Sequence, residues 1–117
     1  MKCESLDVWK RSCKISIEIY RTFFDFNDFG FKDQITRSSL SIASNIAEGI
    51  EKDSLKEKIR FIEIARGSCA ELITQIHIGR AISYIDRTSA QLWIAELNEI
   101  MKMLNALKKT FQHHPHD

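Results

Sequence analysis

Four histidines and three cysteines are among the side chains of this 117-residue sequence that could ligate a metal or act as nucleophiles. They are Cys3, Cys13, Cys69, His77, His113, His114 and His116. A zinc site needs paired Cys or His spacing, and the sequence has neither a CxxC pair nor an HExxH motif. Three of the histidines fall in a polar C-terminal segment that does not preorganise ligands. The odd number of cysteines favours reduced, core-packed thiols, so we expect no metal, no cofactor and a cytoplasmic location.

Two glutamates, Glu48 and Glu71, lie among small and apolar neighbours, with Arg37 and Arg66 as candidate partners. A carboxylate can do acid/base chemistry only where burial or a like charge shifts its pKa, and a sequence reveals neither. We therefore favour structural hydrogen bonding or ion pairing for both glutamates over catalysis. The sequence also lacks a phosphate-binding P-loop and a G-x-G-x-x-G motif, so we do not expect an enzyme.

The basic residues form local clusters that could bind phosphate groups. One cluster lies in the first predicted helix, one at the start of the third, and one near the C-terminus at Lys102, Lys108 and Lys109. A phosphate backbone binds such clusters electrostatically, without a groove-reading motif. The candidate nucleic-acid-binding residues are Lys10, Arg11, Lys14, Lys52, Lys56 and Arg60. A solvated surface of mixed charge is the alternative, because Asp53 and Glu57 are interspersed among them.

The overall composition excludes several classes of protein. The 17 basic and 16 acidic residues give a formal net charge of +1, which argues against a nucleic-acid binder that uses its whole surface. No run of about 18 apolar residues exists, so no membrane-spanning helix is expected, and the N-terminus lacks the features of a signal peptide. A chain of this length can form one domain around one core without metal or disulfide bonds.

Hydrophobic residues recur every three or four positions in four successive segments, which predicts four amphipathic helices. We expect these helices over residues 6–26, 31–49, 55–82 and 88–112. Short connections make successive helices antiparallel neighbours. The sequence thus predicts an all-α, antiparallel up-and-down four-helix bundle in a single domain, residues 1–117.

The expected helix starts carry side chains that can cap exposed backbone N–H groups. Asp53 or Ser54 should cap the third helix, and with Ser54 as the cap Glu57 lies in capping-box register. Thr88 or Ser89 should cap the fourth helix. Its apolar positions form the most regular stripe of the chain, namely Trp93, Leu97, Ile100, Leu104, Leu107 and Phe111.

The first predicted helix has two apolar lines, whereas a helix with one side exposed to solvent needs only one. One line contains Leu6, Trp9, Cys13, Ile17, Tyr20 and Phe24. The other contains Val8, Ile15, Ile19, Phe23 and Phe26. Two lines indicate burial on two sides, and deeper packing in the core explains them as well as a partner subunit does.

The second and third helices contain small residues whose role the pattern leaves open. The second helix has an apolar stripe of Ile35, Ile42 and Ile46, which Leu40 and Ala43 should widen. In the middle of the third helix, Gly67 costs about 1 kcal/mol relative to alanine. Close contact with another helix is our preferred explanation of that glycine, with a kink or a ligand-facing backbone as alternatives.

Three groups of segments resemble the signatures of a known family. They are Leu6–Lys10 with Ile19–Tyr20, Gln34–Ser38 with Ser41–Gly49, and Arg60–Phe61 with Ile64–Ser68 and Glu71–Leu72. Together they resemble the four-helix-bundle proteins encoded in intervening sequences of bacterial large-subunit ribosomal RNA genes. The motif residues to which we assign structural roles are Arg37, Asn45, Glu48, Gly49, Gly67, Ser68 and Glu71. The chain departs from the family pattern at Ala43, where proline is frequent, and at Phe26–Asn27, where Phe-Pro is frequent.

The resemblance implies a bundle that assembles into a ring-like homopentamer. More distantly, the sequence is similar to the accessory variability proteins of diversity-generating retroelements, which bind a reverse transcriptase and nucleic acid through a basic surface. We therefore expect a non-enzymatic homo-oligomer that binds RNA or a nucleic-acid-processing protein through basic helix faces, where symmetry lets weak sites sum. The alternative is a protein–protein scaffold or adaptor with no nucleic-acid role.

Overall fold

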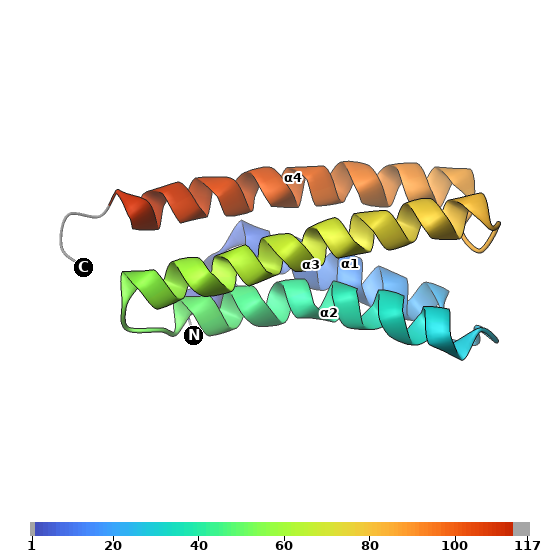
Figure 1. Ribbon diagram of the computed structural model, residues 1–117, viewed down its shortest axis with the longest axis horizontal. Coiled ribbons are helices and arrows are strands. Elements are labelled where there is room, and N and C mark those ends of the chain that lie inside the picture. The colour runs from blue at the N-terminus through green and yellow to red at the C-terminus, as the bar shows by residue number, and fades with distance from the viewer. Residues whose placement is uncertain (1, 114–117) are drawn as a thin grey trace.

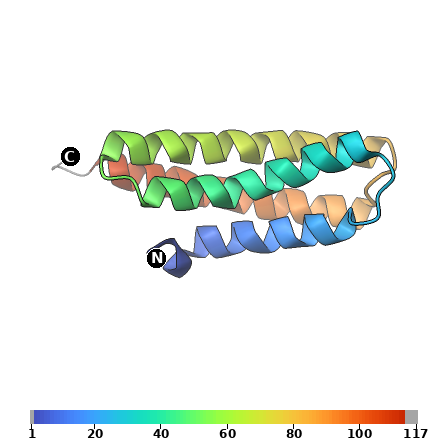
Figure 2. The ribbon, with the colours of Figure 1, turned by 90° about the horizontal axis from the view of Figure 1, so that it is seen from below.

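The computed structural model describes residues 2–113, so His114 and His116 lie outside the described part of the chain. A short 3-10 helix, η1 (Lys2–Ser5), precedes four α-helices, which are α1 (Asp7–Thr22), α2 (Phe29–Ile50), α3 (Leu55–Ala81) and α4 (Arg87–Gln112). Successive helices run antiparallel along a body of 49 × 21 × 20 Å (Figure 1, Figure 2). The predicted all-α, up-and-down four-helix bundle is confirmed. None of the described helices is long and apolar enough to cross a membrane.

The first helix is shorter than expected. α1 ends at Thr22, four residues before the predicted end at 26, and its C-cap residue Phe23 still donates its backbone N–H to Ile19 O at 3.1 Å. The side chains of Phe23 and Phe26 stack in an edge-to-face pair with ring centroids 5.0 Å apart. The chain leaves the helix there because aromatic packing across the end of the bundle replaces another turn.

Side-chain caps define the starts of the other three helices. Ser54 Oγ accepts the backbone N–H of Glu57 at 3.1 Å, which fits the capping-box register. α4 begins one residue earlier than expected, and its cap is Asp86, not Thr88 or Ser89. Asp86 Oδ1 accepts a hydrogen bond from the Ser89 N–H at 2.8 Å. The negative carboxylate at this position also interacts favourably with the positive end of the helix dipole.

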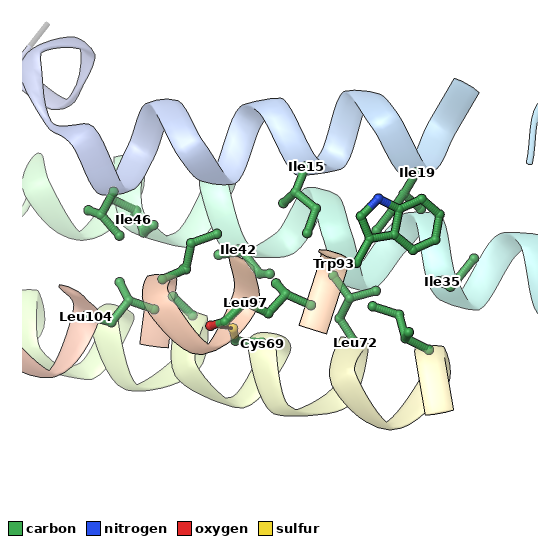
Figure 3. Close-up of a cluster of buried hydrophobic side chains, with 14 of the residues drawn as sticks. Ile15, Ile19, Ile35, Ile42, Ile46, Cys69, Leu72, Trp93, Leu97 and Leu104 are labelled. Carbon is green, nitrogen blue, oxygen red and sulfur yellow. Dashed lines mark hydrogen bonds between the residues drawn. The ribbon is translucent and has the colours of Figure 1, made fainter. Parts of the chain in front are cut away.

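The core lies along the axis of the bundle and is built from the predicted stripes (Figure 3). Ile35, Ile42 and Ile46 of α2 are fully buried, as is the run of Leu97, Ile100 and Leu104 on α4. Leu40 is the exception, because half of its surface is exposed. It lies on the outer side of α2 and does not widen the core stripe. The core is a contiguous set of mostly aliphatic side chains to which all four helices contribute.

The two apolar lines of α1 have different environments. The line through Val8, Ile15 and Ile19 faces the core and is buried. The line through Ile17 and Tyr20 faces outward, with 49% and 42% of these residues exposed. Leu6 and Trp9 of the second line are partly buried against the core, but core burial does not account for Ile17 and Tyr20 in a single copy of the chain.

Glycine marks close helix packing, but not at the expected position. Gly67 is exposed, and a Cβ added there would meet no atom within 4 Å, so the predicted close helix contact at Gly67 is wrong. A Cβ at Gly79 would lie 2.6 Å from Ile85 Cδ1 and 2.9 Å from Phe31 Cζ. A Cβ at Gly49 would lie 3.0 Å from the Cβ of a residue on α3. The ends of the bundle, not the middle of α3, are where the chain passes too close for a side chain.

Candidate nucleic-acid interface

An aromatic ring carries two cations at the connection between α2 and α3. Lys52 Nζ lies 4.8 Å from the centroid of the Phe61 ring, and Arg60 Cζ lies 4.5 Å from it. Phe61 itself is buried against the bundle, so its ring forms a fixed platform. Cation–π attraction holds both positive charges above one spot on the surface. Lys56, which is exposed, lies one turn before Arg60 on the same helix face.

Arg60 forms an ion pair with Glu57 on the same helix. Its Nε donates to Glu57 Oε2 at 3.0 Å, and this hydrogen bond raises the pKa of Arg60 and lowers the pKa of Glu57. Arg60 is a cation near neutral pH with or without this bond, so the effect of Glu57 is to compensate part of its charge. Lys52 and Lys56 add two positive charges to the cluster, and both also attract the Glu57 carboxylate.

A fourth cation at this end has a structural role. Lys58 Nζ donates to the backbone oxygen of Ile50 at 2.8 Å, where it satisfies a carbonyl at the C-terminus of α2. The same ammonium group lies 5.8 Å from the centroid of the Phe111 ring on α4. Lys58 thereby joins three helices and offers little to a ligand.

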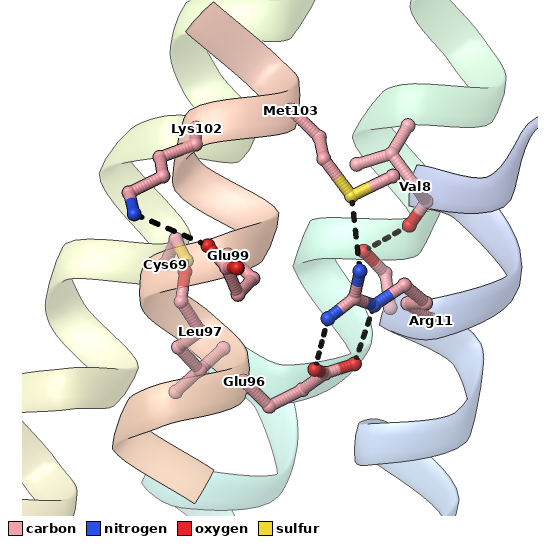
Figure 4. Close-up of polar contacts among 9 residues, drawn as sticks. Val8, Arg11, Cys69, Glu96, Leu97, Glu99, Lys102 and Met103 are labelled. Atoms are coloured by element: carbon pink, nitrogen blue, oxygen red, sulfur yellow. Dashed lines mark hydrogen bonds and ion pairs between the residues drawn. The ribbon is translucent and has the colours of Figure 1, made fainter.

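The predicted cations of α1 do not join this cluster as a set. Arg11 forms a two-pronged pair with Glu96 of α4, and its Nη1 also lies 3.6 Å from Met103 Sδ (Figure 4). This pair raises the pKa of Arg11 and lowers that of Glu96. Arg11 thus links α1 to α4. Lys10 and Lys14 are exposed on α1.

A polar seam joins α2 to α3 where the two helices face each other. Ser38 Oγ donates to Glu71 Oε1 at 2.9 Å, and the hydroxyl groups of Ser41 and Ser68 lie 2.7 Å apart. Asn45 Nδ2 donates to Ser41 Oγ at 2.9 Å and extends the seam by one turn. These bonds satisfy small polar groups between two closely packed helices, and none of them creates an acid/base pair.

An apolar groove between α1 and α2 was not identified as a site from the sequence, although one of its walls was. The groove has a volume of about 420 Å³, and we name it the α1–α2 groove. Its lining residues are Cys13, Ser16, Ile17, Tyr20, Arg21, Leu40 and Ala43. The signal in the sequence was the outward line of α1, together with Leu40 on the outer side of α2.

The thiols are not arranged for metal binding or catalysis. Cys69 Sγ donates to Leu97 O at 3.5 Å inside the core, and burial raises the pKa of this thiol to about 11 (Figure 4). Cys3 is also buried, and burial raises its pKa as well. Within residues 2–113, no three His, Cys, Asp or Glu side chains gather as a potential set of metal ligands.

Comparisons with known proteins agree with this architecture. Residues 4–106 match the family model described as the 23S rRNA-intervening sequence protein. The chain belongs to this family. A crystal structure of a family member of unknown function, described as from the S23 ribosomal protein family of Bacteroides thetaiotaomicron, is 25% identical, with a TM-score of 0.81 over 87% of this chain and 98% of that one. No curated protein matches the sequence. Neither of the two matches indicates an enzymatic activity.

The motif residues of the family fall into two groups in this member. Asn45, Ser68 and Glu71 belong to the polar seam, and Gly49 lies where α2 packs closely against α3. The remaining motif residues, Arg37, Glu48 and Gly67, are exposed.

Neither arginine proposed as a partner for the two motif glutamates reaches them. Arg37 pairs with Asp33 at 3.0 Å, and Arg66 pairs with Glu63 at 2.6 Å. Each of these pairs lies within one helix, one turn apart. Of the charged motif residues, Arg37 and Glu48 therefore lie at the surface, whereas Glu71 accepts a hydrogen bond from Ser38 between α2 and α3.

Proposed function

We propose that this protein is a non-enzymatic, homo-oligomeric helical bundle that binds RNA or a ribonucleoprotein through the cations at its α2–α3 connection. The observation that carries the proposal is the pair of cations, Lys52 and Arg60, held above the face of Phe61. Lys56 adds a third positive charge on the same side of the connection. Two supported cations with a third beside them suit a phosphate backbone, because the two supported side chains lose little freedom when they bind.

A single copy of this cluster supports only weak binding. Three phosphate contacts give a salt dependence with a slope of about −3 in a plot of log affinity against log salt concentration. Several copies in one assembly raise the apparent affinity without any new contact, because the second and later contacts become intramolecular. The family's link to 23S rRNA makes a structured fragment of that RNA the natural probe.

Fluorescence anisotropy with a labelled fragment of 23S rRNA tests the proposal across a series of salt concentrations. The variant carries Lys52→Gln, Lys56→Gln and Arg60→Gln, and its matched control carries Arg37→Gln, Arg80→Gln and Arg87→Gln. Both variants lose three positive charges, but the control loses them away from the α2–α3 connection. We expect the first variant to lose at least about tenfold in affinity and most of the salt slope, and the control to lose far less. Equal losses, or no salt-dependent binding by the native protein, would refute the RNA proposal.

A protein–protein scaffold with no nucleic-acid role is the second candidate, and the α1–α2 groove favours it. An apolar groove bounded by Ile17, Tyr20 and Leu40 is the type of surface that accepts a helix of another protein. Affinity capture from a nuclease-treated lysate distinguishes the candidates. Partners that survive nuclease and are lost in a Leu40→Glu variant favour the scaffold, whereas partners that nuclease removes favour RNA binding.

A further inference from the structure

The exposed aromatic residues gather at one end of the bundle. In the described part of the chain they are Tyr20, Phe24 and Phe29, which lie near the end of α1, on the α1–α2 connection and at the start of α2. Phe24 and Phe29 are 73% and 74% exposed. Rings as open as these contribute little to the stability of the fold. Two of them beside one connection therefore indicate a contact with another molecule.

A lysine lies next to both of these rings. Lys32 Nζ donates to the backbone oxygen of Phe24 at 2.7 Å and lies 5.9 Å from the centroid of the Phe24 ring. Lys32 also follows Phe29 by three positions on α2, so the two side chains are neighbours on one helix face. The bond to Phe24 is solvent-exposed and uses one of three ammonium N–H groups, which leaves two that can bind a ligand. The corresponding bond of Lys58 lies instead in a part-buried junction of three helices.

Phe29 also lines a hollow of about 480 Å³, which we name the Phe29 hollow. Its other lining residues are Gly30, Lys32, Asp33 and Thr36. Its volume is within the range of small-ligand sites, about 300–1,000 Å³. Thr36 Oγ1 already donates to Lys32 O at 2.7 Å, so the hydroxyl can offer a ligand only an acceptor. The Asp33 carboxylate is an acceptor too, and its pair with Arg37 balances its charge.

An unpaired nucleotide has a group to match each of these features. Its base has a flat face that can stack on an exposed phenylalanine, and its phosphate is an anion for Lys32. Each RNA base also carries an N–H donor on its Watson–Crick edge, which the acceptors of the Phe29 hollow can bind. In a duplex these donors are paired and the faces of the bases are stacked on one another. A lipid tail or an apolar peptide side chain would leave Asp33 and Thr36 without a hydrogen-bond donor.

We propose that the α1–α2 connection binds an unpaired nucleotide of single-stranded RNA, whose base stacks on Phe29 and whose phosphate contacts Lys32. Phe24 offers a second ring to the neighbouring base. This site is separate from the cations of the proposed function, because the α1–α2 and α2–α3 connections lie at opposite ends of the 49 Å body (Figure 2). The two sites also differ in kind. Phe61 is buried beneath its cations and offers no open face to a base, whereas the ring of Phe29 is open.

Fluorescence anisotropy with labelled oligouridine of about 12 nucleotides, which forms no duplex by itself, tests the site. Phe29→Ala removes the ring, Phe29→Tyr keeps a ring, and Phe29→Leu keeps an apolar side chain that has no face for stacking. Leu92→Ala is the matched control, because Leu92 is a similarly exposed apolar residue on α4, at 66%. Circular dichroism confirms that each variant is folded.

We expect Phe29→Ala and Phe29→Leu to lose at least about tenfold in affinity for oligouridine, and Phe29→Tyr and Leu92→Ala to bind it like the native protein. Lys32→Gln should lower the affinity and reduce the salt slope by about 0.7, the value for one phosphate of a single strand. Full affinity in Phe29→Leu would overturn the proposal, because the contact would then be hydrophobic and not stacking. Absence of oligouridine binding by the native protein would overturn it as well.

A duplex of oligouridine with oligoadenosine tests the selectivity for unpaired bases. Its affinity should be the same for Phe29→Ala and the native protein, and an equal loss for duplex and single strand would contradict the site. Co-sedimentation with vesicles of phosphatidylcholine and phosphatidylserine tests a lipid surface. Vesicle binding that Phe29→Ala abolishes, with oligouridine affinity unchanged, would replace the nucleotide by a membrane.

The Lys52→Gln, Lys56→Gln and Arg60→Gln triple variant separates this site from the proposed function. Oligouridine should still bind the triple variant, and adding Phe29→Ala should remove that binding. If oligouridine failed to bind the triple variant, the stacking site would be refuted and the cationic site would stand. If a 23S rRNA fragment bound the triple variant as tightly as the native protein, only the cationic site would be refuted.

Discussion

The end of the bundle where α1 meets α2 and α3 meets α4 is closed by aromatic rings, whereas the α2–α3 connection at the other end has cations above one ring. At the aromatic end, Phe26 and Tyr84 lie 4.6 Å apart between centroids, and Phe31 lies 5.1 Å from Tyr84. At the cationic end, Phe61 faces Lys52 and Arg60. The same residue type therefore seals the core at one end and supports charge at the other. We infer that the buried rings of the aromatic end contribute stability and that the cationic end contributes phosphate binding.

The largest effect on stability should come from Phe23→Ala. Phe23 is fully buried and contacts the rings of Phe26, Phe31 and Trp93, so its removal leaves a cavity that these rings cannot fill. We expect a loss of about 3–5 kcal/mol in the free energy of unfolding, measured by urea denaturation at fixed protein concentration. Phe24→Ala, at the next and largely exposed position, should change it by less than about 0.5 kcal/mol. Equal effects of the two substitutions would contradict a closed aromatic end.

Gly79→Ala should have the next largest effect. A Cβ there would lie 2.9 Å from Phe31 Cζ and 2.6 Å from Ile85 Cδ1, and both side chains must move. Overpacking of this kind typically costs about 1–3 kcal/mol, partly offset by the helix preference of alanine. Gly67→Ala is the matched control, because it gains the same preference without a clash in the single chain and should not lower stability. Urea denaturation of both variants in parallel gives the comparison, and a stabilised Gly79→Ala would show that the aromatic end is loosely packed.

The two glycines also mark how far sequence reasoning extends. Periodicity predicted four helices and the buried stripe of α4, because a repeat of three and four positions follows directly from helix geometry. It could not tell which glycine meets a neighbour, since that depends on where the axes of two helices come closest. The pattern therefore favoured close contact at Gly67, while the contacts occur at Gly49 and Gly79.

The sequence pattern also could not predict side-chain pairs between segments that are far apart in the chain. Arg11 and Glu96 are 85 positions apart, so no spacing rule connects them, and Arg11 looked like a free cation. The two apolar lines of α1 were recognised, but the sequence did not show which of them faces the core. Both lines have helical periodicity, and only the packed bundle distinguishes them. Leu40 was assigned to the core for the same reason. Local signals did better at helix ends, where Ser54 was correct and Asp86 was missed in favour of Thr88 or Ser89.

A pH dependence at the aromatic end should be smaller than either substitution effect. Tyr84 Oη donates to Asp28 Oδ2 at 2.7 Å, and this bond lowers the pKa of Asp28 and raises the pKa of Tyr84. A lowered carboxyl pKa stabilises the fold above its unfolded-state value and loses that effect as pH falls through the folded value. A raised phenol pKa stabilises below its unfolded-state value and loses that effect as pH rises through the folded value.

The Tyr84→Phe variant measures this contribution. Thermal unfolding across pH should show a lower Tm for the variant near neutral pH, and the difference from the native protein should shrink below about pH 4 and above about pH 10. Phe31 and Phe26 keep their contacts with the ring at position 84, so packing is preserved. A difference that is constant over the whole range would mean that the hydroxyl group acts without Asp28.

The smallest effect on stability should come from the cations at the other end. Lys52 and Arg60 lie at the surface, and the pair of Arg60 with Glu57 is solvent-exposed, a type of pair that contributes little to folding. The Lys52→Gln and Arg60→Gln double variant should therefore unfold at the same urea midpoint as the native protein, while its affinity for RNA falls. Phe61→Ala is the informative companion, because it removes the support and leaves both cations in place. It should lower both stability and RNA affinity, and if RNA affinity were unchanged, the position of the cations above the ring would be irrelevant to binding.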